Sequence, residues 1–274
     1  MQQQPIIGFI GAGNMAGAII DGMLASGYPA DRIWVCDRDA PKRDAFAAKG
    51  LNATDDNERL IEACEAVVLA VKPQVLKQVL EPLRAAFQAR KPLLVSVAAG
   101  VTVESIDRWL GGGAAVIRTM PNTPALVMTG ATGLYANEAV DASERTAIEA
   151  IFSAIGVAVW VSDEDALHSV TATSGSAPAY FFRFMEAMQK AAEDAGLDAA
   201  TAQKLIVQTA MGAARMVEQT GETPAQLRQK VTSPKGTTEQ AILSFERDDL
   251  DAVVARAMQA CMDRSWVLSQ ELAE

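Results

Sequence analysis

The sequence predicts an α/β domain followed by an all-α domain. Up to Val161, short apolar and β-branched runs alternate with helical patterns, which is typical of a parallel sheet covered by helices on both faces. From Ser162 onward, long Ala- and Met-rich helical runs replace this alternation. We therefore place the domain boundary near Ser162 and predict domains over residues 1–161 and 162–274.

The elements of the first domain follow from this alternation. The expected strands are Ile6–Ile10, Arg32–Cys36, Ala66–Val71, Leu93–Val97, Ala115–Thr119 and Val157–Val161. The expected helices are Asn14–Ser26, Pro41–Lys49, Val75–Leu83, Val103–Leu110 and Ala142–Ile155.

In the second domain, helix boundaries are marked by capping residues. Gly196 and Gly221 predict helix ends, whereas Asp198 and Thr223-Pro224 predict helix starts. The run Ala199–Val217 carries apolar or small residues on nearly every face, and such a helix needs neighbours on all sides. We expect a second copy of the chain to supply them, and hence a homodimer through the helical domain.

Composition narrows the class of protein. The chain has 274 residues, of which 50% are hydrophobic and 21% charged, with a net charge of −10 that argues against a nucleic-acid surface. The start MQQQP has no basic segment, and no apolar run approaches the roughly 20 residues that span a membrane. The three scattered cysteines fit free thiols in a reducing compartment and no metal-site spacing. We expect a cytoplasmic protein without a metal.

A glycine-rich turn follows the first expected strand. The run Gly11-Ala12-Gly13-Asn14-Met15-Ala16 matches G-x-G-x-x-G/A between a strand and a helix. The first glycine makes the tight turn, the second lets the backbone approach a pyrophosphate, and the small Ala16 lets helix and strand pack closely. The first domain is therefore predicted to be a Rossmann domain that binds a dinucleotide at the helix N-terminus.

Two residues after the second strand bear on the choice of cofactor. Asp37 can accept hydrogen bonds from both ribose hydroxyls, which favours NADH. Arg38 can instead pair with the 2′-phosphate of NADPH. The sequence leaves NADPH or NADH open.

Two more loops lie at expected strand ends, where ligands bind in open α/β sheets. They are Ala70–Gln74 and Met120–Pro124, and proline stiffens both of them.

A third candidate segment is far away in the sequence. Val231–Thr238, VTSPKGTT, leads into a helical run, Glu239 to Phe245. Unpaired N–H groups at a helix start can hold a carboxylate, and the threonine hydroxyls add donors that also accept.

These segments belong to a set of motifs that resembles the pyrroline-5-carboxylate reductase family over essentially the whole chain. The motifs are Gly8–Ala16, Ala70–Gln74, Ser96–Val101, Arg118–Val127, Ser174–Tyr180 and Ser233–Thr238. The resemblance implies NAD(P)H-dependent reduction of 1-pyrroline-5-carboxylate to L-proline by a homo-oligomer, often a ring of dimers. It also implies a substrate site partly completed by a neighbouring subunit.

The resemblance also assigns site residues. Substrate binding falls to Ser233, Gly236, Thr237 and Thr238, and Thr238 is our choice for the catalytic hydroxyl at the ring nitrogen. Cofactor contacts fall to Gly11, Gly13, Asn14, Met15, Asp37, Arg38, Asn57, Ala70, Val71, Lys72, Pro73, Ala98 and Asn122. The resemblance implies that the loops Ala70–Pro73 and Pro121–Thr123 surround the nicotinamide side of the cofactor. Whether the proton comes from Thr238, from water or from the protonated substrate stays open.

Two positions depart from the family pattern, since Ala177 and Lys235 stand where glycines are usual. Lys235 either points to solvent or brings a cation to the carboxylate site. The only histidine, His168, has no evident catalytic partner in the sequence and is expected to be structural.

Other functions remain as alternatives. An imine reductase or a β-hydroxyacid dehydrogenase would share the domain order, although the catalytic-lysine motif expected of the latter is not found. A non-catalytic dinucleotide-binding regulator would have no need of the VTSPKGTT segment.

Overall fold

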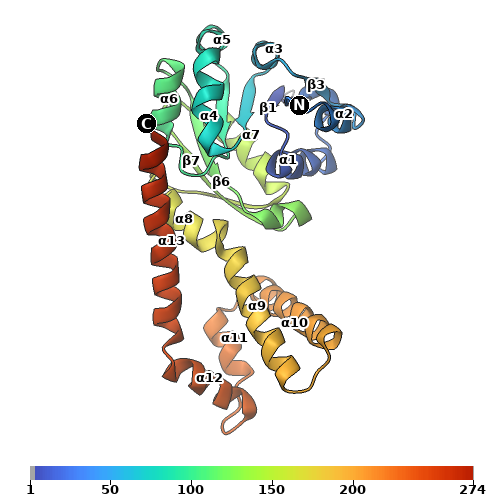
Figure 1. Ribbon diagram of the computed structural model, residues 1–274, viewed down its shortest axis with the longest axis vertical. Coiled ribbons are helices and arrows are strands. Elements are labelled where there is room, and N and C mark those ends of the chain that lie inside the picture. The colour runs from blue at the N-terminus through green and yellow to red at the C-terminus, as the bar shows by residue number, and fades with distance from the viewer. Residues whose placement is uncertain (1–3, 274) are drawn as a thin grey trace. The chain divides into compact units, whose positions relative to one another are not determined.

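The computed structural model describes residues 4–273. The first three residues of the MQQQP segment, for which no basic side chains were noted, therefore lie outside the described residues. The chain forms two compact units (Figure 1). The first, called here the Rossmann unit, reaches to Ser176 and resumes at Cys261, and the second, the helical unit, is Ala177–Ala260. The division differs from the predicted boundary at Ser162.

One eight-stranded sheet forms the centre of the Rossmann unit. Its strands are β1 (Ile7–Ile10), β2 (Ile33–Cys36), β3 (Asn52–Thr54), β4 (Ala66–Leu69), β5 (Leu93–Ser96), β6 (Val116–Met120), β7 (Gly130–Ala136) and β8 (Gly156–Trp160). They lie in the order β3-β2-β1-β4-β5-β6-β7-β8. The predicted parallel pairing is confirmed from β3 to β6, but β7 pairs antiparallel with β6, and β8 follows the direction of β7.

Two strands, β3 and β7, were not predicted. In β7 two of the residues are glycines, which are depleted in strands. The glycines are needed for close packing. A Cβ on Gly130 would lie 2.9 Å from the Ile155 carbonyl oxygen, and one on Gly133 would lie 2.6 Å from the Val170 side chain. These small residues let β7 pack closely against the residue before β8 and against α8. They also remove the residue pattern by which a strand is recognised in a sequence.

Helices cover both faces of this sheet. They are α1 (Asn14–Ala25), α2 (Ala40–Ala47), α3 (Asn57–Ala63), α4 (Pro73–Leu80), α5 (Arg84–Arg90), α6 (Val103–Leu110), α7 (Ala142–Ser153) and α8 (Ala166–Val170). Of these, α3 and α5 were not expected. Alternate strand residues face α1 and α7 on one side and α3 to α6 on the other, because successive side chains point to opposite faces of a sheet.

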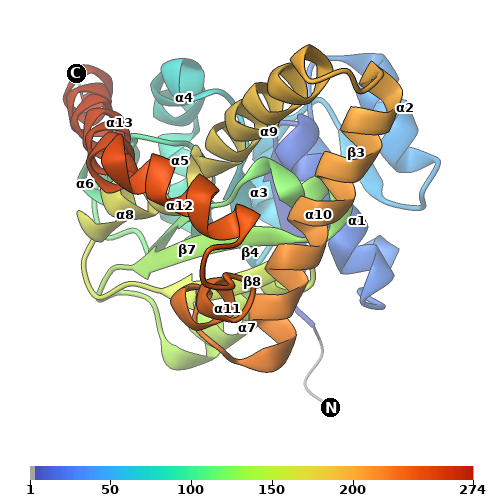
Figure 2. The same ribbon diagram turned by 90° about the horizontal axis from the view of Figure 1, so that it is seen from below.

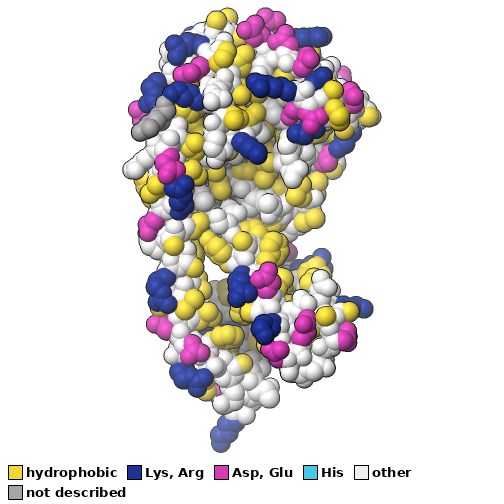
Figure 3. Space-filling view, in the orientation of Figure 1, with side chains coloured by type: hydrophobic (Ala, Val, Ile, Leu, Met, Phe, Trp, Pro, Cys, Tyr) yellow, Lys and Arg dark blue, Asp and Glu magenta, His cyan; other side chains and the backbone are white. Residues whose placement is uncertain are grey.

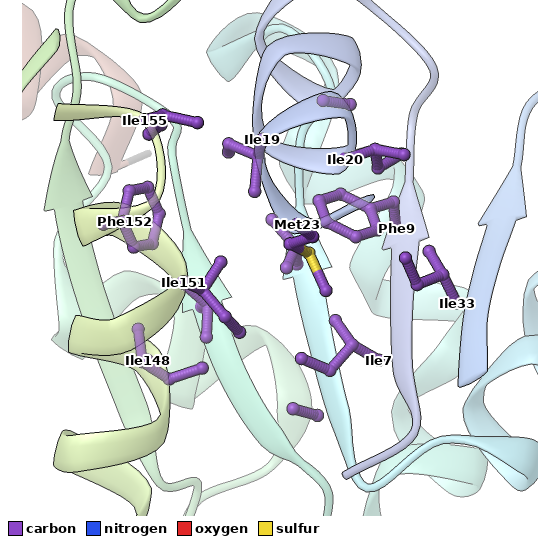
Figure 4. Packing of buried hydrophobic residues seen from close by; sticks show 14 of the residues in the cluster. Ile7, Phe9, Ile19, Ile20, Met23, Ile33, Ile148, Ile151, Phe152 and Ile155 are labelled. Atoms are coloured by element: carbon purple, nitrogen blue, oxygen red, sulfur yellow. The ribbon is translucent and has the colours of Figure 1, made fainter. Parts of the chain in front are cut away.

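The core under α1 and α7 is densely apolar. Figure 4 shows Phe9 of β1 beside Ile20 and Met23 of α1, with Ile151 and Phe152 of α7 across the same layer. All of these side chains are buried. Burial of such a side chain stabilises the fold by about 1.5–3 kcal/mol, so this layer fixes the turn between β1 and α1.

The helical unit contains α9 (Ala177–Asp194), α10 (Ala199–Thr220), α11 (Pro224–Lys230), α12 (Thr237–Arg247) and the first part of α13 (Leu250–Ala273). Within residues 4–273 no strand follows Trp160, as predicted. The α9–α10 pair packs as a hairpin (Figure 2).

The predicted helix boundaries are confirmed. Asp198 caps α10 by accepting from the Thr201 N–H, and Thr223 forms a capping box at the start of α11. Gly221 ends α10 with φ of +69°, a left-handed conformation that glycine adopts without strain.

The last part of α13 packs within the Rossmann unit. The Cys261 thiol lies 3.4 Å from the Ser176 hydroxyl, and the ring of Trp266 stacks on His168 with centroids 4.0 Å apart. Leu268 packs against Gly100. These contacts explain why α8 and the C-terminal residues belong to the Rossmann unit rather than to the helical one. In the described part of the chain, no helix is both long enough and apolar enough to cross a bilayer.

Candidate functional site

The glycine-rich turn has the tight backbone and the close contacts that its sequence predicts. Gly11 adopts φ of +103°, and a Cβ there would lie 2.8 Å from the backbone of Ala70. Its N–H donates to the carbonyl of Cys36 at 2.8 Å, so the turn continues the sheet pairing of β1 with β2. Ala16 is fully buried. Gly11 is therefore required both by its backbone conformation and by its contact with the loop after β4.

Gly13, in contrast, faces open space. Its φ of −82° is open to any residue, and a Cβ there would meet no atom within 4 Å. It is the N-cap of α1, and no side chain caps this helix. The N–H groups of the first turn, which begins at Asn14 and Met15, are therefore available to an anion, and the shallow surface at Gly13 lets a pyrophosphate approach.

Asp37 makes contacts within the protein that the sequence did not indicate. One carboxylate oxygen accepts from the Ala12 N–H at 2.9 Å, and the other accepts from the Asp39 N–H at 2.9 Å. Burial alone would raise the pKa of this carboxyl, but the N–H groups of Asp39 and Ala12, with Lys42, keep the pKa below its usual 3.8. Asp37 thus stays ionised and fixes the glycine-rich turn, so its oxygens are only partly free for ribose hydroxyls.

A cavity of about 290 Å³ lies beside this turn. Its lining includes several predicted cofactor residues, namely Gly11, Asp37, Arg38, Asn57 and Val71. The exposed Arg38 is the cation of this set. Asn57 begins α3, which Asp56 caps through the N–H groups of Glu58 and Arg59.

Other lining residues of the cavity were not predicted from the sequence. Val75, Gln78 and Val79 project into it from one face of α4. Their i, i+3, i+4 spacing is a helical signal that could have identified them once the start of α4 was placed. Together with Arg38 and Asn57 they give a half-apolar pocket that suits an adenosine group.

The two proline-containing loops follow β4 and β6, the parallel strands on either side of β5. Ala70 donates its N–H to the Ile10 carbonyl at 2.9 Å, which places Ala70 and Val71 directly against the glycine-rich turn. Pro73 is the first residue of α4, and the exposed Lys72 is its N-cap. Ala98, in the loop after β5, is buried and accepts from the Val101 N–H.

Asn122 occupies the loop after β6. Its side-chain amide donates to the Ser174 carbonyl at 3.0 Å and accepts from the Ala131 N–H at 2.9 Å. Asn122 is only 8% exposed. Its predicted role as a direct cofactor ligand stays a prediction, whereas its contacts within the protein are defined.

The VTSPKGTT segment forms the start of α12 in the helical unit. Gly236 is the N-cap, and no side chain caps the helix, which begins at Thr237. A Cβ on Gly236 would lie 2.9 Å from the Ser233 carbonyl oxygen, which also accepts the Gly236 N–H. Ser233, Thr237 and Thr238 are exposed. Exposed hydroxyls and an uncapped helix start are the features that carboxylate binding requires.

Lys235 adopts φ of +61°, a left-handed conformation that costs an ordinary residue about 1–2 kcal/mol. This explains why the family pattern has glycine here. Its N–H donates to the Glu239 carboxylate at 2.7 Å. The other departure, Ala177, begins α9 and is buried.

His168 has structural partners. Its Nδ1 lies 2.8 Å from the Ser265 hydroxyl, and its ring stacks on Trp266. Burial, followed by the charge of Arg118, lowers the pKa of His168 below 6.5. These contacts hold α13 against α8.

The structure therefore brings Gly11, Asp37, Arg38, Asn57 and Val71 together around one cavity. The remaining predicted cofactor residues lie at the start of α1, in the loops after β4, β5 and β6, and at the start of α4. The predicted substrate residues belong to the helical unit.

Comparisons with known proteins agree with this arrangement. Residues 164–268 match the family described as pyrroline-5-carboxylate reductase dimerisation, and residues 6–100 match that described as NADP oxidoreductase coenzyme F420-dependent. A pyrroline-5-carboxylate reductase of Pseudomonas aeruginosa is 44% identical over 271 residues, which cover 98% of this chain and 99% of that one.

Solved structures give the same result. A pyrroline-5-carboxylate reductase from Coxiella burnetii superposes with a TM-score of 0.94 at 46% identity, over 97% of this chain and 99% of the other. The Plasmodium falciparum enzyme with NADP bound superposes with a TM-score of 0.86 at 26% identity, over 98% and 100% of the two chains. With relatives this similar over nearly its whole length, and with a glycine-rich cofactor turn and a dimerisation domain in the same order, the chain belongs to the pyrroline-5-carboxylate reductase family.

Proposed function

We propose that this protein reduces 1-pyrroline-5-carboxylate to L-proline with NADPH or NADH, the last step of proline biosynthesis. The observation that carries the proposal is the pair of uncapped helix starts with a glycine at the N-cap. Helices α1 and α12 both begin on glycines, Gly13 and Gly236, and no side chain caps them. Asp or Thr side chains cap α3, α6, α7, α10 and α11. Helices α2, α4, α5 and α8 also lack a side-chain cap, but their N-cap residues carry side chains. One start suits a pyrophosphate and the other a carboxylate, and family membership names the two ligands.

The reaction needs little covalent chemistry from the protein. A bound NAD(P)H would supply the hydride for the imine carbon and would be oxidised to NAD(P)⁺, while the ring nitrogen takes a proton. A protonated imine is already electrophilic, so the protein contributes mainly position and electrostatics. This agrees with the structural role of His168, whose ring nitrogen faces Ser265.

Different segments of the chain bind the cofactor and the substrate. The turn at Gly11 and Gly13 and the start of α1 hold the pyrophosphate, while Arg38 and Asn57 face the adenosine end. The N–H groups of Thr237 and Thr238 hold the substrate carboxylate, and the Thr238 hydroxyl hydrogen-bonds the ring nitrogen.

The proposed assembly is a homodimer through the helical domain, with a ring of dimers as the larger form and the partner subunit contributing to the substrate site. Its support is the dimerisation-family match and the apolar side chains exposed in the helical unit. The proposed compartment is the cytoplasm, in keeping with the free thiols of Cys36, Cys64 and Cys261.

Steady-state kinetics test the proposal. Purified protein should oxidise NADPH or NADH only when 1-pyrroline-5-carboxylate is added, and proline should form in equal amount. Turnover of 3-hydroxyisobutyrate instead would identify a β-hydroxyacid dehydrogenase. Cofactor binding without oxidation by any imine would identify a regulator, and either result would reject the proposed reaction.

A further inference from the structure

The side chain of Asn122 joins three separate parts of the Rossmann unit. It belongs to the loop after β6, its amide nitrogen donates to the Ser174 carbonyl, and its amide oxygen accepts from the Ala131 N–H of β7. The residue is buried, and a buried polar group left without its partner costs about 1–3 kcal/mol. The loop after β6 is therefore held both to β7, the next strand, and to the segment at Ser174, 52 residues further along the chain.

Ser174 lies in an unusual piece of backbone. Residues Thr171–Gly175 form a π-helical turn, in which the Ser176 N–H donates to the Thr171 carbonyl at 2.8 Å. Such turns are rare and occur frequently at functional sites. This turn is the last segment of the Rossmann unit before the chain enters the helical unit at Ala177.

A second contact ties the same two segments. A Cβ on Gly175 would lie 2.5 Å from the terminal methyl of Met120, the last residue of β6. The turn therefore packs directly on the end of β6, independently of the Asn122 hydrogen bonds. A shift of the loop after β6 must be transmitted to the π-helical turn, since closely packed contacts do not deform continuously.

We propose that Asn122 is a positioning residue that couples the loop on the nicotinamide side of the cofactor site to the π-helical turn Thr171–Gly175. Cofactor occupancy then fixes both the loop used in hydride transfer and the backbone that leads into the substrate-binding helices. This inference rests on the proposed reductase function, because the nicotinamide side is assigned from the family resemblance.

Asn122→Asp tests the coupling because the two side chains have the same shape. A protonated carboxyl can donate to the Ser174 carbonyl and accept from the Ala131 N–H, as the amide does. An ionised carboxylate cannot donate, and it repels the Ser174 oxygen. Burial raises the pKa of the introduced carboxyl, so the switch between the two forms falls within an assayable pH range.

The ionisable groups on the surrounding elements are few. Arg118 on β6 is paired with Glu164 at 2.5 Å, Tyr135 lies on β7, and His168 lies on α8 beside the turn. The loop after β6 and the π-helical turn carry none. Wild-type protein and Asn122→Ala contain the same ionisable groups. Dividing the pH profile of kcat for Asn122→Asp by the profile of either protein therefore removes the contribution of these groups.

Relative to wild type, the kcat of Asn122→Asp should be within about threefold near pH 5 and about tenfold lower near pH 8. Asn122→Ala should be about tenfold lower at both pH values, and the KM for NADPH should change less than about threefold in either variant. A pH profile of Asn122→Asp that matches wild type would overturn the inference. A raised KM for NADPH with unchanged kcat would also overturn it, by making Asn122 a plain cofactor ligand.

Hydrogen exchange on the wild-type protein covers the case in which the variants do not fold. NADPH should slow the exchange of the amides in residues 171–176 together with those in the loop at Asn122. Protection confined to the glycine-rich turn would reject the coupling. A wild-type protein without imine-dependent NADPH oxidation would instead reject the proposed function, and the exchange measurement would still be interpretable.

Discussion

The Rossmann unit and the helical unit place their apolar side chains in opposite ways. In the Rossmann unit, both faces of the sheet are covered by helices, and almost all large apolar side chains of the strands from β1 to β6 are buried. In the helical unit, the buried hydrophobic residues are Ala177, Ala202, Ile206 and Leu227. Phe181 and Phe182 of α9 are 65% and 58% exposed.

The exposed apolar residues of the helical unit are numerous and visible as yellow side chains over its helices (Figure 3). On α10 alone, Leu205, Val207, Met211 and Met216 are exposed. Patches of this kind mark surfaces that another protein covers. One chain thus completes the cofactor-binding core, whereas the helices need a second copy, as the dimerisation-family match indicates.

The largest expected effect is at the glycine-rich turn. Gly11→Ala should destabilise the protein by about 3 kcal/mol and abolish turnover, since the residue adopts φ of +103° and a Cβ would press on Ala70. Gly13→Ala is the matched control, because a Cβ there has open space. It should fold normally and bind NADPH at least about tenfold more weakly. Urea unfolding and NADPH titration measure the two effects, and equal stability of both variants would contradict the assignment.

Replacing the exposed aromatic residues of α9 with charged ones tests the role of the helical unit in self-association. The double variant Phe181→Asp, Phe182→Asp should weaken self-association by about 100-fold or more, because ionised carboxylates resist burial at an interface. The control Val127→Asp changes a side chain of the Rossmann unit that is 72% exposed. Sedimentation velocity should show a loss of mass for the double variant alone. If the double variant kept the mass of wild type, α9 would not be the self-association surface.

Thr238→Ala should separate substrate chemistry from cofactor binding. We expect kcat/KM for the imine to fall about 10- to 100-fold, since the hydroxyl contacts the ring nitrogen as charge changes there. The dissociation constant for NADPH should stay within about twofold. Thr232→Ala, which removes a hydrogen bond to the Arg228 carbonyl, is the control. Wild-type kinetics in Thr238→Ala would remove Thr238 from the mechanism.

The smallest expected effect is on stability, at one lysine in each unit whose backbone is left-handed. Lys235 in the helical unit and Lys91 in the Rossmann unit adopt φ of +61° and +49°. Changing either to glycine should raise the free energy of unfolding by about 0.5–1 kcal/mol. This is the backbone strain that glycine relieves, minus the conformational entropy that glycine adds to the unfolded chain. Only Lys235→Gly can also change the KM for the imine. Destabilisation by either substitution would show that the lysine side chain makes a compensating contact.

Much of this organisation could be predicted from the sequence, because local patterns carry it. The G-x-G-x-x-A turn, the helix at Val103–Leu110 and the caps at Asp198 and Thr223 depend on neighbouring residues and were placed correctly. The antiparallel β7 was missed, since its glycines serve packing partners far away in the sequence.

The hydrogen-bond partners of polar side chains could not be predicted from the sequence. The ribose contact expected of Asp37 stays a prediction, and the sequence did not indicate that its carboxylate also accepts from the Ala12 N–H. The cofactor contact expected of Asn122 also stays a prediction, and the sequence did not indicate that its amide joins β7 and the π-helical turn. Both residues were located at the correct strand ends, but the direction of a polar side chain depends on which backbone groups the fold leaves unpaired.

The contrast between a self-sufficient Rossmann unit and an incomplete helical unit is tested most directly by thermal unfolding at several protein concentrations, with sedimentation equilibrium on the same samples. Because assembly binds only the folded state, the melting temperature should rise with protein concentration. The folded protein should then sediment as two or more chains at every concentration. A folded monomer whose melting temperature is independent of concentration would contradict the account.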